Sequence, residues 1–329
     1  MKLGELGEFG FIARIRAAVE DGAGVRLGIG DDCAALEMPV GELLLTTTDM
    51  LIEEVHFRRA WTGLEDLGYK SAAVNLSDIA AMGGTPRFLY LSLGVPEAFD
   101  VTDLEALVAG FVAAAGECGA ALVGGDTCRS PGPLLISVTA EGSSPADQLV
   151  RRAGARAGDG IYVSGTLGDS ALALRCLRQG KTAAPPLLAR HRRPRARTGL
   201  GRSLAATGLA TAMIDISDGL LADLGHVLTA SAVGARLAPD DLPLSPTFRK
   251  ALETDPDLLA LALGGGEDYE LLFTVPAERE REVADLAAAA EVPATRVGVV
   301  TASEGLVVRD GRGRDLAAGE KGFNHFAPR

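Results

Sequence analysis

The sequence predicts an α+β protein of mixed α/β type, built in two halves. Helix-like and strand-like segments alternate along each half of the 329-residue chain. A stretch rich in Ser, Pro, Arg and Gly at residues 143–158 separates the two series. Apolar residues make up 47% of the chain, which is enough to give each half its own core. We therefore predict an N-terminal α/β domain at residues 1–145 and a C-terminal α/β domain at residues 146–329.

In the first half, apolar residues at helical spacing predict a helix at residues 9–19, which ends before the breaker run Asp-Gly-Ala-Gly. Short runs rich in Leu, Val and Thr predict strands, and longer Ala-rich segments predict helices. The remaining elements expected in this half are a strand at 41–49, a helix at 64–81, a strand at 88–95, a helix at 101–118 and strands at 120–123 and 134–142.

The second half continues with the same kinds of segment. A strand that runs into a Gly/Ser-containing loop and then a helix occurs more than once. The elements expected here are a strand and turn at 159–165, a helix at 169–179, a strand at 213–217, a helix at 220–230, a loop at 264–268 and strands at 269–275, 297–300 and 306–308.

Charge and apolar patterning exclude several classes of protein. The net charge of −12 argues against a nucleic acid or an anionic membrane as a partner. The N-terminus has no long apolar segment followed by a cleavage site, so we expect no signal peptide. The most apolar stretches, at residues 104–115 and 258–263, are too short to span a membrane. The four cysteines show no CxxC pairing, and we expect reduced thiols in a cytoplasmic protein.

Short loops that combine small residues with carboxylates are the strongest functional signal. Strand-to-helix junctions present backbone N–H groups that favour phosphate oxygens. Carboxylates beside phosphate repel it unless a hard cation such as Mg²⁺ lies between them. The segments are 28–32, 46–49, 75–78, 124–127, 215–219 and 264–268.

Helix capping is the alternative reading of these segments. Asp and Ser are preferred N-caps, and Gly-Asp is ordinary turn chemistry, so capping is the better explanation of any one segment alone. Capping needs one carboxylate per helix, however, and does not explain the pair Asp31 and Asp32 or the pair Asp215 and Asp218. Together the segments favour a site for metal and phosphate.

The sequence contains neither a GxxxxGK[ST] phosphate loop nor the glycine loop and lysine of protein kinases. If ATP is used, metal, backbone N–H groups and an arginine must hold its phosphates. Residues 165–169, GTLGD, are a candidate phosphate loop and equally a helix cap. The basic run at 190–197 lacks interleaved aromatic residues, and we interpret it as a solvated helix start or an anion-facing loop. Ser170 has no nucleophile-elbow pattern, which argues against a serine hydrolase.

The chain resembles the thiamine-monophosphate kinase family in the order of its motifs. These are GEFGFI, GIGDDCA, TTTDMLIEEVHF, NLSDIAAMGG, GGDT, SGTLGDSALAL, DISDGL, GGGEDYELLF and GFNHF, which together cover essentially the whole chain. The resemblance implies an aminoimidazole ribonucleotide synthetase-like fold, with each half a mixed sheet covered by helices. It also implies direct in-line transfer of the ATP γ-phosphoryl group to thiamine monophosphate, assisted by several Mg²⁺ ions and without a catalytic side chain.

The resemblance further implies roles for single residues. It implies metal ligation by Asp32, Thr47, Thr48, Asp49, Asp78, Asp126, Asp215 and Asp218. It implies ATP contacts by Gly125, Arg152 and Ser217, with Arg151 as an alternative to Arg152. It places His56, Glu267 and Phe323 near the substrate, although Trp or Tyr is expected at the last position. A lone His near apolar residues is more often structural. The family resemblance also suggests a homodimer paired through strands of the N-terminal half.

Two other functions stay open at this point. One is a different ATP-dependent enzyme of the same superfamily, such as an amidine-forming ligase of purine synthesis. The other is a nucleotide sensor without catalysis, although a sensor has little need for so many carboxylates. A selenophosphate synthetase is disfavoured because no reactive Cys stands in a glycine-rich N-terminal segment, and a hydrogenase-maturation relative because the chain ends His-Phe-Ala-Pro-Arg, without a Cys tail.

Overall fold

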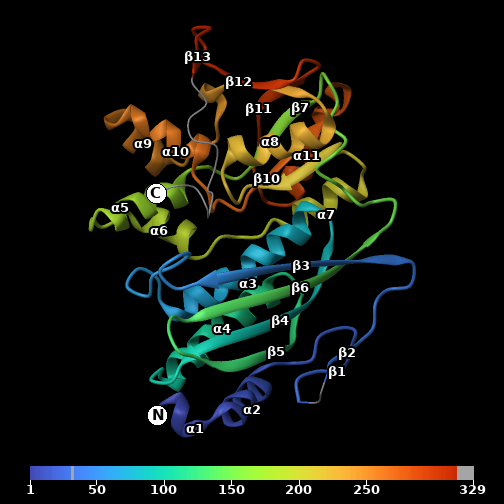
Figure 1. The fold of residues 1–329 in the computed structure, drawn as a ribbon. Helices are drawn as coiled ribbons and strands as arrows, with labels where there is room; N and C mark the ends of the chain where they lie inside the picture. The colour runs from blue at the N-terminus through green and yellow to red at the C-terminus, as the bar shows by residue number, and fades with distance from the viewer. Residues whose placement is uncertain (31–32, 317–329) are drawn as a thin grey trace. The chain divides into compact units, whose positions relative to one another are not determined.

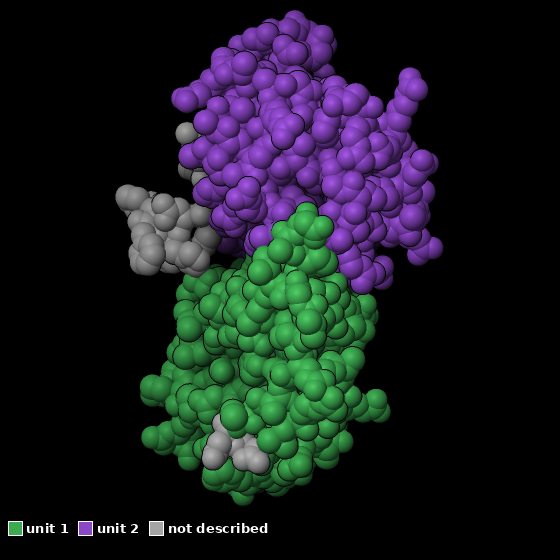
Figure 2. Space-filling view, turned by 90° about the vertical axis from the view of Figure 1, so that its right-hand side faces the viewer, with its two compact units in different colours: residues 1–79, 84–147 green, residues 80–83, 148–329 purple. Residues whose placement is uncertain are grey.

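The computed structural model describes residues 1–30 and 33–316. The chain divides into two compact units, coloured green and purple in Figure 2. Unit 1 comprises Met1–Ile79 and Gly84–Asp147, and unit 2 comprises Ala80–Gly83 and Gln148–Arg329. Each unit contains its own sheet and its own buried core (Figure 1).

Unit 1 contains the elements predicted for the first half, including the helix at 9–19, together with one short N-terminal helix and a hairpin that were not predicted. Its elements are α1 (Leu3–Leu6), α2 (Glu8–Ala18), β1 (Val25–Leu27), β2 (Ala35–Leu36), β3 (Glu42–Ile52), α3 (Leu64–Ala81, whose last two residues belong to unit 2), β4 (Thr85–Pro96), α4 (Val101–Glu117), β5 (Ala121–Ser130) and β6 (Leu135–Pro145).

The main sheet of unit 1 has the strand order β3-β6-β4-β5. Only β4 and β5 are parallel, and the other pairs are antiparallel. Helices α3 and α4 lie against one face of this sheet (Figure 1). Alternate residues of the central strands, such as Leu91 and Val138, are buried beneath the helices together with Leu76 and Phe111. The helices therefore cover one face of the sheet and form the core of unit 1 there.

The opposite face of this sheet is covered only in part. The β1–β2 hairpin packs there against Phe88 and Val123. Along β3, every second residue from Leu44 to Met50 is exposed, and these two apolar side chains retain 53% and 56% of their accessible surface. β3 is also an edge strand of the described sheet, so unit 1 presents an apolar edge to solvent.

Unit 2 contains the second half of the predicted elements and several helices that the sequence did not predict. Its elements are β7 (Gly160–Ser164), α5 (Asp169–Arg178), α6 (Pro185–Arg192), α7 (Thr198–Ala206), β8 (Ala212–Asp215), α8 (Leu220–Ser231), β9 (Gly234–Leu237), α9 (Pro246–Thr254), α10 (Leu259–Gly264), β10 (Leu271–Val275), α11 (Arg281–Ala289), β11 (Ala294–Thr301), β12 (Gly305–Arg309) and β13 (Asp315–Leu316). Short 3₁₀ helices occur at Pro239–Asp241, Pro256–Leu258 and Ala277–Arg279.

The sheet of unit 2 has the order β13-β12-β9-β11-β7-β10-β8, with β12 parallel to β9 and the other pairs antiparallel. Side chains alternate between two cores. Ile161, Val163 and Leu272 pack with α5, α8 and α10, whereas Tyr162 and Phe273 pack with α7 and α11. Helices thus cover both faces of this sheet. The predicted fold class, with a mixed sheet covered by helices in each half, is confirmed.

Three of the six carboxylate segments are not loops. Residues 46–49 lie within β3 and residues 75–78 within α3, as the predicted strand at 41–49 and helix at 64–81 require, so it is wrong to describe these segments as loops. Residues 124–127 lie within β5, which continues past the predicted strand at 120–123. Three consecutive threonines are β-branched and suit a pleated strand. The segment at 75–78 buries Leu76 on the core face of an 18-residue helix. No helix among residues 1–30 and 33–316 is both long and apolar enough to cross a membrane.

Candidate active site

Thr47, Asp49 and Asp78 form a polar cluster on the helix-covered side of the unit 1 sheet. Thr47 and Asp49 alternate with exposed residues of β3, so their side chains lie on the same face as α3. The Thr47 hydroxyl donates a 2.6 Å hydrogen bond to Asp78 Oδ2. The two carboxylates interact electrostatically, and burial together with the charge of Asp78 raises the pKa of Asp49 to about 6.

This cluster fits a divalent cation by its chemistry. Two half-buried carboxylates that repel one another, with a hydroxyl beside them, are hard oxygen donors of the kind that Mg²⁺ prefers. Within the described residues, no group of three or more His, Cys, Asp or Glu side chains gathers to hold a metal.

Thr48 and Asp126 lie on the other face of the same sheet. The Thr48 hydroxyl donates to Val138 O at 2.9 Å. Asp126 on β5 pairs with Ser92 on β4, Ser92 pairs with Ser137 on β6, and Ser137 pairs with Met50 on β3, so that these four residues form one row across the sheet. Three strand spacings of about 4.8 Å separate the ends of this row by roughly 14 Å. The structure therefore does not bring Asp126 next to Asp49 within unit 1.

Gly125 has a packing role in addition to the nucleotide contact predicted for it. Its φ is +153°, and a Cβ there would overlap the backbone of Leu91 on the neighbouring strand β4. Only glycine therefore allows β4 and β5 to approach at this row.

His56 lies in the turn that follows β3. The ring atom Nδ1 accepts a 3.0 Å hydrogen bond from the backbone N–H of Ile52. The backbone N–H of His56 donates to Ile52 O at 2.9 Å. Because Nδ1 is an acceptor, the ring proton of neutral His56 lies on Nε2. The imidazole is thereby fixed in one tautomer, with Nε2 as a donor.

In unit 2, two of the predicted segments are joined by backbone hydrogen bonds. Glu267 N donates to Ser217 O and Tyr269 N donates to Ile216 O, both at 2.8 Å. Ile216 N donates to Glu270 O at the same distance. A Cβ on Gly266 would meet Ser217 O, so the two loops are in direct contact. The structure thus brings the Asp215–Asp218 segment and Glu267 together.

Asp223 is a residue of this region that the sequence did not indicate. Its carboxylate accepts hydrogen bonds from Asp218 N at 3.1 Å and Gly219 N at 3.0 Å, and so caps the start of α8. Burial, followed by the nearby charge of Asp218, raises the pKa of Asp223 to about 7. The signal available in the sequence was an acidic residue in the first turn of the predicted helix.

Arg151 and Arg152 are both exposed and begin unit 2's first loop. Arg151 O accepts from Met213 N at 3.0 Å, which ties the loop to β8. Ser231 Oγ, at the end of α8, accepts from Gly154 N at 3.1 Å. The backbone is thus anchored on both sides of Arg152, and both arginine side chains remain candidates for the ATP contact.

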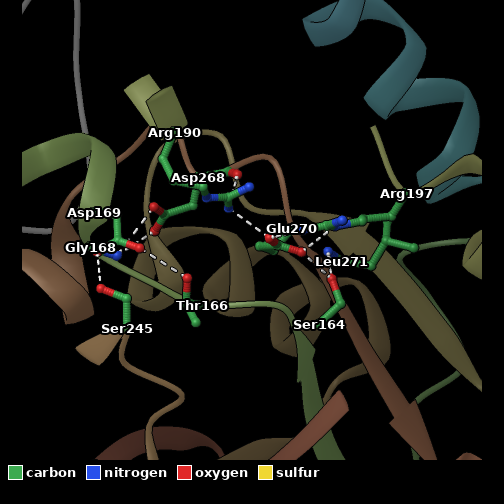
Figure 3. A network of polar contacts seen from close by, with 10 residues as sticks. All are labelled: Ser164, Thr166, Gly168, Asp169, Arg190, Arg197, Ser245, Asp268, Glu270 and Leu271. Carbon is green, nitrogen blue, oxygen red and sulfur yellow. Dashed lines mark hydrogen bonds and ion pairs between the residues drawn. The ribbon is translucent and has the colours of Figure 1, made fainter. Parts of the chain in front are cut away.

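The basic run at 190–197 was interpreted incorrectly. Arg190 and Arg197 are mostly buried and donate to Glu270, whose side chain is completely buried (Figure 3). These arginines therefore belong to an internal polar network, whereas the sequence indicated a solvated helix start or an anion-facing loop. The run could not reveal this because Glu270 lies more than 70 residues further along the chain.

The candidate phosphate loop at 165–169 is held by acidic side chains. Gly168 N donates to both carboxylate oxygens of Asp268, at 2.9 and 3.1 Å (Figure 3). Burial raises the pKa of Asp268 to about 8, although Gly168 N–H and the charge of Arg190 oppose this. Asp169 accepts from Thr166 and from Ser245 Oγ, at 3.0 and 2.6 Å. The N-cap of α5 is Gly168, which has no side chain to cap the helix, and the segment is held by the distant residues Asp268 and Ser245.

Two predicted site residues, Asp32 and Phe323, lie outside the described residues. Seven of the other predicted residues form two groups, one in each unit, whereas Thr48, His56, Gly125, Asp126 and Arg152 lie outside both groups. Thr47, Asp49 and Asp78 are clustered in unit 1, and Asp215, Ser217, Asp218 and Glu267 lie on the paired loops of unit 2.

Comparison with known proteins gives a consistent family. The model of the AIR synthase related protein N-terminal domain matches residues 30–143, and that of the C-terminal domain matches residues 156–311. The chain is 43% identical over 333 residues to thiamine-monophosphate kinase from Salmonella typhimurium, covering 98% of both proteins.

Solved structures agree with this comparison. Thiamine-monophosphate kinase from Stenotrophomonas maltophilia has a TM-score of 0.83 and 44% identity, covering 91% of this chain and 95% of that one. AaThiL complexed with AMPPCP and TMP has a TM-score of 0.77 and 37% identity, covering 99% of both chains. The chain therefore belongs to the thiamine-monophosphate kinase family of AIR synthase related proteins.

Proposed function

We propose that this chain transfers the γ-phosphoryl group of ATP to thiamine monophosphate and produces thiamine diphosphate. The observation that carries the proposal is the likeness to AaThiL complexed with AMPPCP and TMP, which extends over 99% of both chains at 37% identity. AMPPCP has the charge and shape of ATP but a methylene group in place of the bridging β–γ oxygen. The relative was therefore captured with a nucleotide and an acceptor together.

The reaction needs alignment more than it needs an acid or a base. The acceptor is a phosphate oxygen that is already ionised at neutral pH, so no side chain has to remove a proton. Both reactants are anions, and the transfer is direct and in line, so positioning and charge neutralisation provide most of the catalysis. We accordingly assign no side chain as a nucleophile or general base.

Carboxylates and hydroxyls of both units are the proposed magnesium ligands. When bound, several Mg²⁺ ions supply the positive charge that lets two phosphates approach. The cluster of Thr47, Asp49 and Asp78 supports this assignment, because its repelling carboxylates are stabilised by a cation. The full proposed set is Asp32, Thr47, Thr48, Asp49, Asp78, Asp126, Asp215 and Asp218.

We assign the nucleotide to Gly125, Arg152 and Ser217, and thiamine monophosphate to His56, Glu267 and Phe323. The fixed tautomer of His56 supports a role as a hydrogen-bond donor, through Nε2, to an anionic phosphate. Arg152 extends from an anchored loop and is exposed, as a phosphate contact requires. Phe323 can stack on an aromatic ring of the substrate but cannot donate a hydrogen bond.

We also propose that the protein is a homodimer that works in the cytoplasm, where ATP is available. The uncovered face and free edge of β3, with Leu44 and Met50 more than half exposed, support an interface in unit 1. Analytical ultracentrifugation at micromolar concentration should show a dimer. A Leu44→Glu variant should shift it toward monomer, and a wild-type protein that sediments only as monomer would rule the dimer out.

The activity test uses the purified chain with ATP, Mg²⁺ and thiamine monophosphate. Thiamine diphosphate and ADP should appear in equal amounts, measured by chromatography. A folded, magnesium-replete protein that makes no thiamine diphosphate would reject the proposal. Phosphate release that depends on a ribonucleotide instead would favour a ligase, and ATP binding without any turnover would favour a sensor.

A further inference from the structure

The loop that carries Glu267 has a strained backbone. Glu267 and Tyr269 have φ angles of 68° and 50°, although neither is glycine. A non-glycine residue in this left-handed region costs of order 1–3 kcal/mol. Such a conformation persists only where surrounding contacts hold it, so the contacts on this loop decide where the Glu267 carboxylate lies.

Arg190 makes contacts on both sides of Tyr269. Its Nη2 donates to Asp268 O at 3.1 Å and to Glu270 Oε1 at 2.6 Å (Figure 3). The residue between these two acceptors is the left-handed Tyr269. A single guanidinium therefore joins the residues before and after the strained position and fixes the distance between them.

Glu270 is the anchor for this contact. Its side chain has no exposed surface, and it also accepts from Ser164 Oγ at 2.6 Å and from Arg197 Nε at 2.7 Å. Ser164 in turn accepts from Leu271 N at 2.8 Å. The carboxylate is thus held from β7, from the end of α6 and from the segment before α7, and it cannot move with the loop.

The residue next to Arg190 reaches Glu267 itself. His191 Nδ1 lies 3.3 Å from Glu267 Oε2 and 3.0 Å from Ser170 Oγ. The last turn of α6 therefore contacts the loop at three points, on both sides of Tyr269: the Glu267 carboxylate, the Asp268 carbonyl and the Glu270 carboxylate.

We propose that Arg190 is a positioning residue for substrate binding: through Asp268 O and Glu270 it holds the Glu267 loop in the conformation that binds the thiamine end of the acceptor. This inference rests on the proposed phosphorylation of thiamine monophosphate. Arg197 donates to both carboxylate oxygens of Glu270, through Nε and Nη2, and so neutralises the same buried charge, whereas the bond to Asp268 O comes from Arg190. Variants of the two arginines can therefore distinguish an effect on the position of the loop from a general effect on stability.

The test compares Arg190→Gln with Arg197→Gln by steady-state kinetics with ATP and thiamine monophosphate varied separately. In either variant the other arginine still neutralises Glu270, so both should fold. Arg190→Gln should raise the KM for thiamine monophosphate about tenfold, equal to about 1.4 kcal/mol, and leave the KM for ATP within about twofold. Arg190→Lys should recover part of the loss. Arg175→Gln, in the half-exposed pair with Asp255, is the control and should leave every constant unchanged.

Arg197→Gln should lower the melting temperature as much as Arg190→Gln does, because each variant loses one ion pair with Glu270. It should raise the KM for thiamine monophosphate less than about threefold, because the contact of Arg190 with Asp268 O remains. Equal KM changes in the two variants, or equal changes for both substrates, would overturn the inference, because a purely structural role predicts them. If Arg190→Gln does not fold, Arg190→Lys decides, because one ammonium group cannot reproduce both contacts of the guanidinium: a raised KM for thiamine monophosphate alone supports the inference, and an unchanged KM refutes it. A wild-type protein that does not phosphorylate thiamine monophosphate would instead reject the proposed function.

Discussion

Replacing Glu270 by Gln should destabilise the fold strongly, because it removes the buried negative charge with which both Arg190 and Arg197 form ion pairs. The carboxylate is completely buried and accepts hydrogen bonds from both guanidinium groups and from Ser164 (Figure 3). Gln has the same shape but cannot neutralise the arginines, and its amide N–H₂ is a donor facing donors. Breaking a buried ion pair from one side costs roughly 3–5 kcal/mol.

We expect the lower end of that range, about 3 kcal/mol, because the two arginine side chains retain 20% and 15% exposure and are partly solvated. With a urea m-value of about 2 kcal/mol per molar, the unfolding midpoint should fall by about 1.5 M. Circular dichroism follows the whole chain, and the fluorescence of Trp61, the single tryptophan, follows unit 1. Glu282→Gln, in the exposed pair with Arg279, should leave the midpoint unchanged. A shift below about 0.5 M for Glu270→Gln would refute the reasoning, since it would mean that the arginines do not need the carboxylate.

Three further predictions concern single residues. Asp49→Asn should lower kcat by about 10²–10³-fold with an unchanged circular dichroism spectrum, because it removes a proposed Mg²⁺ ligand; full activity would reject that role. Gly125→Ala should cost at least about 1–3 kcal/mol in thermal unfolding, since its Cβ would overlap the Leu91 backbone; an unchanged melting temperature would contradict the packing argument. Burial raises the pKa of Asp268 in the folded protein to about 8. Between about pH 4 and pH 8 this carboxyl is therefore protonated in the folded state and ionised in the unfolded state, so the protein loses stability as the pH rises through that range. Asp268→Asn should therefore gain stability relative to wild type from pH 5 to pH 8, by at most about 1.4 kcal/mol per pH unit in urea titrations; parallel pH profiles would show that this carboxyl does not titrate there.

The fold was predictable from the sequence where periodicity is strong. The helix at residues 64–81 has the predicted bounds, and the helices at 101–118 and 220–230 differ by one residue at one end. The helices at 185–192 and 246–254, by contrast, were not predicted. Both begin with proline at the first helical position and are short, so they carry only two turns of apolar pattern.

The candidate site was predictable only to the level of local motifs. Composition drew attention to the carboxylates, and the strand predicted at 41–49 already contained Thr-Thr-Thr-Asp49, although the polar composition of that segment is also found in loops. Composition could not indicate which carboxylates lie together. Asp49 and Asp78 interact although 28 residues separate them, whereas Thr48, one residue away, points to the other face because strand side chains alternate.

Pairing between distant segments also explains why the supporting residues were missed. Glu270 and Arg190 are 80 residues apart, and neither stands out among its neighbours in the sequence. Glu270 directly precedes the buried strand β10, and Arg190 belongs to the basic run. Their meeting requires α6 to lie against the start of β10, which no local pattern encodes. A buried carboxylate needs a cation beside it. The position of Glu270 next to an apolar strand segment was therefore the indication in the sequence that part of the basic run faces inward. The same rule applies to the role proposed for Arg190: a residue that holds a strained loop through its charge does so better when buried, because solvent would screen that charge.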